Sequence, residues 1–103
     1  MVKLVAMYRT PDDRKAFDDH YNDIHTPLVK KYPGLRRLEV AKIYGAIPTG
    51  RDDPKQYLIA EMYFDDHDAM QNAFRSPEGK AAANDLMEFA GKIVSMFYAE
   101  VQE

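Results

Sequence analysis

Hydrophobic and polar residues follow two different periods along the chain. Runs of β-branched and aromatic residues, several of them alternating with polar ones, predict strands over residues 2–8, 35–44, 56–64 and 93–101. Apolar residues that recur every three or four positions predict helices over about 12–33, 68–74 and 76–90, and residues 45–54 form a predicted loop. The order βαββαβ is the ferredoxin-like pattern, an α+β fold with an antiparallel sheet and its helices on one face.

The first predicted helix begins after a cap at Thr10 or Asp12 and ends near Gly34. At about 100° per residue, its apolar side consists of Phe17, Tyr21, Ile24 and Leu28. His20 and His25 flank this apolar stripe, so the two imidazoles are not expected to share a face. A spacing of five also differs from the three or four of a two-histidine metal site on a helix, and we expect no metal.

Pro27 stands just after the second of these histidines. Because proline has no N–H, the carbonyl of Asp23 loses its helical partner. One interpretation is a bend over 23–26 that turns His25 towards the sheet. The other is that Pro27 only marks a helix boundary, with a new turn capped by Thr26 or Asp23.

Histidine titrates near neutral pH, so His25 is a candidate general acid or base in a cavity between helix and sheet. The alternative is a boundary histidine bonded to a backbone carbonyl. His20 is a second candidate, which lines the same cavity, packs under the second strand or orients neighbours of His25. His67 lies among acidic residues at a helix start and is interpreted as a surface residue.

Tyrosine is abundant, with seven residues in the chain. A phenol at an apolar cleft can orient a substrate or act as a weak acid. The alternative is aromatic packing in the core or between copies of the chain. The candidate substrate-binding tyrosines are Tyr8, Tyr21, Tyr63 and Tyr98.

Both faces of the last two strands are apolar. In 56–64, Tyr57, Ile59 and Tyr63 share one face with Glu61, the lone charge, and the opposite face is wholly apolar. One sheet with two helices can cover only one of its faces. The other face is therefore expected to pack on a second copy, which gives a homodimer with two facing sheets.

Composition narrows the class of protein. A chain of 103 residues is expected to form one domain, residues 1–103. With 14 basic and 17 acidic residues, its net charge of −3 gives no general attraction to nucleic acid or to an anionic membrane. There is no cysteine, no apolar run that could span a bilayer and no signal-peptide pattern at the start, so a cytoplasmic protein is expected.

The chain resembles the EthD-like proteins of the dimeric α+β barrel superfamily. The resemblance covers the element order and the following residues: Val2-Lys-Leu-Val-Ala-Met-Tyr8, Phe17, His20, Tyr21, His25, Pro27, Leu28 and Pro33-Gly34-Leu35. It implies two copies that form a dimeric α+β barrel. It also implies a cofactor-independent enzyme, or an enzyme-like protein, that acts on a small apolar molecule, aromatic, polyketide-like or lactone-like.

Three functions follow from these observations. The first is proton transfer (isomerisation, dehydration or cyclisation) with His25 as acid or base, because neither a metal motif nor a nucleotide loop is present in the sequence. The second is a non-catalytic protein that binds a small hydrophobic ligand in the helix–sheet cleft. The third, found in other branches of the superfamily that the chain resembles, is an oxygenase-like or haem-handling role.

Overall fold

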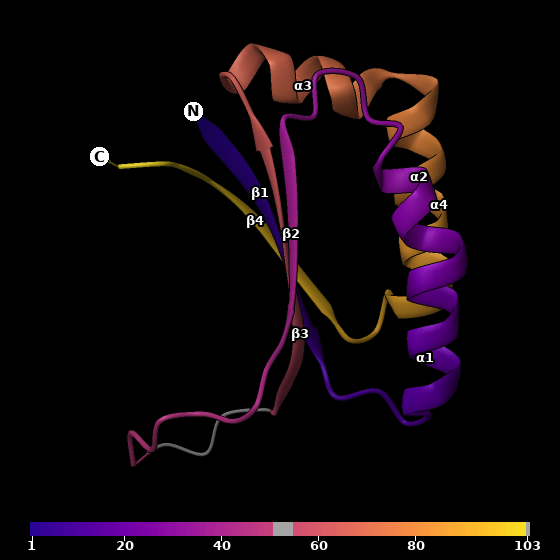
Figure 1. Ribbon diagram of the computed structural model, residues 1–103, viewed down its shortest axis with the longest axis vertical. Coiled ribbons are helices and arrows are strands. Elements are labelled where there is room, and N and C mark those ends of the chain that lie inside the picture. The colour runs from indigo at the N-terminus through magenta and orange to yellow at the C-terminus, as the bar shows by residue number, and fades with distance from the viewer. Residues whose placement is uncertain (51–54, 103) are drawn as a thin grey trace.

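The computed structural model of the protein describes residues 1–50 and 55–102, so part of the predicted loop, residues 51–54, lies outside it. The predicted βαββαβ order is confirmed, although each helical region is divided into shorter pieces (Figure 1). The elements are β1 (Val2–Arg9), α1 (Arg14–His20), the π-helical η1 (Tyr21–His25), α2 (Thr26–Val29), β2 (Arg37–Lys42), β3 (Gln56–Phe64), α3 (His67–Arg75), α4 (Pro77–Ala90) and β4 (Val94–Glu100). None of these helices is both long and apolar enough to cross a bilayer.

The strands form a single antiparallel sheet in the order β2-β3-β1-β4. α1, α2 and α4 stand on one side of the sheet, and α3 lies at one end of it (Figure 1). The predicted architecture, an antiparallel sheet with its helices on one face, is therefore confirmed. The core lies between these two layers, and its most deeply buried large side chains are Tyr8, Phe64 and Met70.

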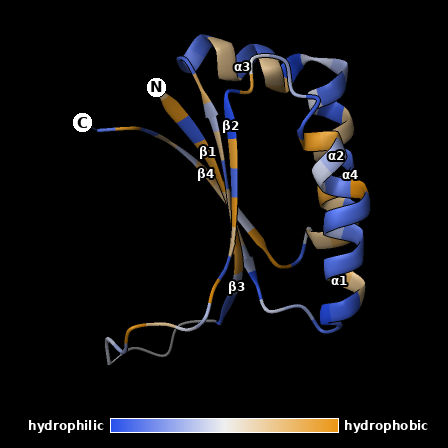
Figure 2. Ribbon diagram, viewed as in Figure 1, coloured by the Kyte–Doolittle hydropathy of each residue, from blue (hydrophilic) through white to orange (hydrophobic). Residues whose placement is uncertain are grey.

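The opposite face of the sheet is not covered by any of the described helices, and it is more polar than one strand alone indicates. Strand pairing places Lys3 beside Glu61, with Nζ 2.7 Å from Oε2, and the Arg37 guanidinium 4.2 Å from the centre of the Tyr63 ring. Phe97 is 49% exposed on the same face. Figure 2 shows the strands passing repeatedly between apolar and polar residues. Apolar side chains and ion pairs thus share this face.

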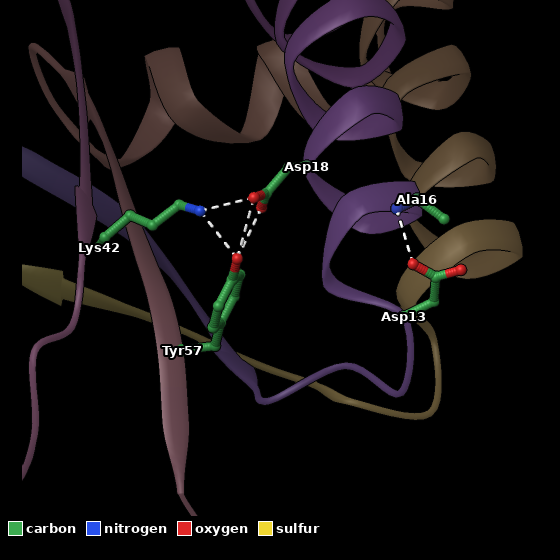
Figure 3. Close-up of polar contacts among 5 residues, drawn as sticks. All are labelled: Asp13, Ala16, Asp18, Lys42 and Tyr57. Carbon is green, nitrogen blue, oxygen red and sulfur yellow. Dashed lines mark hydrogen bonds and ion pairs between the residues drawn. The ribbon is translucent and has the colours of Figure 1, made fainter.

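The start of α1 differs from the prediction. Asp13 is the N-cap, and its Oδ1 accepts a hydrogen bond of 3.0 Å from the Ala16 N–H (Figure 3). Thr10 and Asp12 were the wrong choices, because helical backbone begins only at Arg14 and the residue directly before it makes the cap.

Strict alternation along β3 predicts that Tyr57 lies on the uncovered face, but in the structure it does not. Tyr8 pairs with Leu58 and Arg9 pairs with Gln56, so Tyr57 is an extra residue in β3 without a partner in β1. Such a bulge locally breaks the alternation of side chains. The Tyr57 ring therefore reaches the helix layer, where its centre lies 5.7 Å from that of Phe17.

Candidate functional site

The first helical region continues through Pro27, but it passes through one π-helical turn directly before it. The Thr26 N–H donates to the carbonyl of Tyr21, five residues earlier, and α2 then begins with proline in its first turn. A π-turn holds one residue more than an α-turn, and such turns often occur at functional sites. Helical backbone thus continues across Pro27, with no side-chain cap at the junction, and the π-turn before it leaves His25 buried.

The π-turn changes which residues face the sheet. The buried positions are spaced by four residues, wider than the 3.6 of a regular helix, and are Phe17, Tyr21, His25 and Val29. Ile24, expected within the apolar stripe, is 49% exposed. The expectation for Ile24 was wrong because it assumed a regular helix throughout. His25 occupies the buried position instead and is only 4% exposed.

His20 and His25 meet at one carboxylate. His20 Nε2 lies 2.8 Å from Oδ1 of Asp85, and His25 Nδ1 lies 3.0 Å from Oδ2 of the same residue. Asp85 comes from α4, on the buried side of that helix between Ala82 and Leu86. The expectation that the two imidazoles do not share a face was wrong, because hydrogen bonds between residues five apart in the π-turn bring positions 20 and 25 to the same side.

The pairing determines which nitrogen of His25 carries the proton. An ionised carboxylate only accepts hydrogen bonds, so Nδ1–H of neutral His25 must be the donor to Asp85. Nε2 is then the nitrogen left to accept a proton. Burial lowers the pKa of His25 below its usual 6.5; the bond to Asp85 raises it by less, and His20 lowers it further. His25 is therefore neutral at pH 7.

A small cavity lies between the helices and the sheet, directly beside His25. Its volume is about 20 Å³, roughly the space of one water molecule. The lining residues with polar side-chain atoms are Tyr8, Tyr21, His25 and Tyr32. The rest of the lining is apolar and includes Met96.

The three phenols remain protonated over the physiological pH range. Burial raises the pKa of Tyr21 to about 12, and it raises the pKa values of Tyr8 and Tyr32 as well. A phenol that keeps its proton can donate a hydrogen bond to an oxygen atom of a ligand. The cavity therefore combines one neutral base with three hydroxyl donors.

The remaining candidates lie elsewhere. Tyr63 packs under Arg37 on the uncovered face of the sheet, away from the cavity. Tyr98 is 57% exposed on β4, where it lines an open groove. His67 is exposed at the start of α3, and its ring centre lies 5.8 Å from that of Tyr98. Of the four candidate tyrosines, the structure thus brings only Tyr8 and Tyr21 to His25.

Two residues of the site were not found from the sequence. Asp85 had a signal, since it is an acidic residue between Ala82 and Leu86 on the apolar side of a predicted helix. Tyr32 directly precedes Pro33 and Gly34 at the predicted end of the first helix, where a side chain of the core is not expected. Its side chain nevertheless points back to the core and is 9% exposed.

A second polar cluster attaches α1 to the sheet. Lys42 Nζ lies 2.7 Å from both Asp18 Oδ2 and the Tyr57 hydroxyl, and that hydroxyl donates to Asp18 Oδ1 at 2.9 Å (Figure 3). Burial raises the pKa of Asp18, but the bonds from Lys42 and Tyr57 outweigh it, and the pKa lies below its usual value. This cluster holds in place the helix that carries His20.

The arrangement around Asp85 differs from that of a metal centre. The carboxylate lies between the two imidazoles and accepts a hydrogen bond from each. Within residues 1–50 and 55–102, no group of three or more histidine, aspartate or glutamate side chains is placed to hold a metal ion.

Comparison with known proteins gives relatives over nearly the whole chain. An uncharacterized 11.0 kDa protein from the thcB-thcC intergenic region of Rhodococcus erythropolis is 34% identical over 100 residues, 97% of this chain and 94% of that protein. A crystal structure of an ethyl tert-butyl ether D (EthD) family protein from Bacillus halodurans C-125 is 48% identical, covers 99% of both chains and has a TM-score of 0.91.

A more distant structure, a hydroxynitrile lyase from Passiflora edulis, has a TM-score of 0.76 and 17% identity over 99% of this chain and 94% of the lyase. At that identity the likeness shows the fold alone, which is thus also the fold of an enzyme. The family model described as the EthD domain matches residues 9–93. The model covers most of the chain, and this chain belongs to the EthD family.

Proposed function

We propose that the protein catalyses proton transfer on a small neutral substrate, with His25 as the general base. The observation that carries this proposal is the bond from His25 Nδ1 to Asp85, which leaves Nε2 as the proton-accepting nitrogen of a buried, neutral imidazole, and His25 lines a cavity. A base positioned in this way contributes typically 10²–10⁴ in rate.

The step uses residues of this chain only. Nε2 of His25 takes a proton from the substrate, and the electron pair left behind moves onto a substrate oxygen. Hydrogen bonds from the phenols of Tyr8, Tyr21 and Tyr32 stabilise the negative charge on that oxygen. Asp85 stabilises the imidazolium that forms, as a carboxylate does beside a catalytic histidine. Return of the proton to another atom completes an isomerisation, and loss of a leaving group completes an elimination.

Two further observations support the proposal. Each group that it needs is supplied by a side chain, so the reaction requires no cofactor. The hydroxynitrile lyase shows that this fold accommodates an enzyme.

Ligand binding without chemistry is the second candidate, and the apolar lining of the cavity favours it. A carrier needs the cavity but not the pairing of His25 with Asp85. Loss of the Asp85 carboxylate would then leave its function intact, whereas it would impair proton transfer.

We also propose that the active form is a homodimer whose uncovered sheet faces pack on each other. Phe97 is half exposed on that face. Its strand partner in β1 is Val5, which has its side chain on the same face. Contact with a second copy would cover the apolar side chains, and the ion pair of Lys3 with Glu61 would lie at the same interface.

Elimination of 5-nitrobenzisoxazole tests the catalytic proposal. Removal of the C3 proton of this neutral carbon acid breaks its N–O bond and releases a coloured phenolate, without any other reactant. We expect the protein to accelerate this reaction over buffer, and His25→Gln to reduce the acceleration by about 10² or more.

His67→Gln is the control, because it removes an exposed imidazole of the same kind and should leave the rate unchanged. An unchanged rate in a folded His25→Gln protein would contradict the assignment of the base. Binding of the compound by the wild type without any acceleration would instead support the carrier.

A further inference from the structure

An open groove lies on the helix side of the sheet, between β4 and the pair α3 and α4. Its volume is about 610 Å³, within the range of small-molecule sites in proteins. No lining residue is charged, and the side chains that form its walls include Phe74, Met87, Met96 and Tyr98. Three of these are markedly exposed, Met87 at 62%, Met96 at 43% and Tyr98 at 57%.

The groove adjoins the small cavity beside His25. Tyr32, Leu86 and Met96 line both spaces, so these side chains form the boundary between them. Methionine is unbranched and adapts its shape readily. Met96 is only half buried on an edge strand, so of these three side chains it is the one most free to rotate away from the boundary.

We propose that this groove binds the apolar body of an uncharged, ring-containing substrate, whose reactive end passes Met96 to reach His25. The proposal rests on the proposed function and assigns its substrate class. A neutral ligand is required because an ion would lose its hydration in a groove that offers no counter-charge. Aromatic and methionine walls suit a flat hydrophobic ring system.

The groove lies mainly on the helix side of the sheet and borders the proposed dimer interface at Phe97. Met96 and Tyr98 pair with Ala6 and Leu4, which face the helices, whereas Phe97 lies between them on β4 and belongs to the uncovered face. The continuity with the cavity is the feature that points to a small molecule. A partner protein packed on the groove would have no need of a connection to the cavity beside His25.

Two fluorescent probes with one skeleton test the charge requirement. N-phenyl-1-naphthylamine is neutral, and 8-anilino-1-naphthalenesulfonate carries a sulfonate on the same ring system. We expect saturable binding of the neutral probe, one per chain, and binding of the sulfonate that is weaker by at least about tenfold. Equal binding of both probes would overturn the proposed substrate class.

Two lysine substitutions on α4 test the location. Ala83 lines the groove and Ala81 does not, although both are exposed on the same helix. Ala83→Lys should weaken binding of the neutral probe by about tenfold or more, and Ala81→Lys should leave it unchanged. Equal affinities in the two variants would contradict the location. Suppose instead that the wild type binds no probe while Ala83→Lys sediments differently from it. That pair of results would show that a second copy of the chain covers the groove.

His25→Gln separates this inference from the proposed function. The variant should bind the neutral probe with wild-type affinity while it loses the elimination of 5-nitrobenzisoxazole. If both probes bound equally while the elimination still depended on His25, the groove proposal would be rejected. The assignment of His25 as the base would stand.

Discussion

The Nδ1 atom of His25 lies 3.0 Å from Oδ2 of Asp85, 60 residues further along the chain. This bond joins a π-helical turn to the helix α4. His20 bonds to the other oxygen of the same carboxylate. Because Asp85 holds Nδ1, the acceptor nitrogen of the buried imidazole is Nε2. This relationship orients the buried imidazole for its proposed role as a base.

Replacement of Asp85 by asparagine should separate orientation from charge. Asp85→Asn keeps the size of the side chain but no longer requires a proton on Nδ1 of His25, so we expect the elimination rate to fall by about 10² or more. Glu88→Gln is the matched control, an equal loss of charge at an exposed position of the same helix. If the two variants were equally active and equally folded, Asp85 would have no positioning role.

The elimination rate should rise with pH and then stay constant. Only neutral His25 can accept a proton, and burial places its pKa below 6.5. The apparent pKa of kcat/KM should therefore lie below 6.5, with a plateau from neutral pH upwards. A midpoint above 6.5 would mean that the catalytic base is not this buried imidazole.

The same lowered pKa affects folding. Between the folded and unfolded pKa values of His25, the unfolded chain binds more protons, so the free energy of unfolding rises with pH through that window. This stability is complete above 6.5 and is lost as pH falls below it. Urea titrations of wild type and His25→Gln at several pH values should show that this part of the pH dependence disappears in the variant.

Gly79 should be irreplaceable by alanine. A Cβ at this position would lie 2.1 Å from the backbone carbonyl oxygen of Ala73, where α3 meets α4. Backbone cannot move aside as a side chain can, and we expect Gly79→Ala to lower the free energy of unfolding by on the order of 1–3 kcal/mol. Gly45→Ala is the control, because nothing lies within 4 Å of its Cβ. Equal melting temperatures would show that the two helices can separate without cost.

The homodimer should depend on the uncovered face of the sheet. Phe97→Asp places a charge on that face and should raise the dimer dissociation constant at least about tenfold. Ile24→Asp is a matched control, because Ile24 and Phe97 are both 49% exposed but Ile24 lies on the helix side. Sedimentation equilibrium measures both. A wild-type protein that stays monomeric at micromolar concentration would exclude the facing-sheet dimer.

Periodicity predicted the element order and the layers, since strands and helices depend on local patterns. It indicated His25 and His20 as candidates but did not predict how they are positioned, for three physical reasons. A single π-turn shifted the buried position from Ile24 to His25. A bulge turned Tyr57 to the other layer. Asp85 reaches His25 only through tertiary packing of α4, which no local pattern contains.

The ¹⁵N chemical shifts of the His25 ring, followed by NMR between pH 5 and 8, report which ring nitrogen carries the proton and at what pH the ring titrates. At neutral pH we expect Nδ1 to carry the proton and Nε2 to carry none, with titration below 6.5. Asp85→Asn should mix the two tautomers. A neutral ring protonated at Nε2, or a His25 that titrates at or above 6.5, would contradict the account of an oriented base.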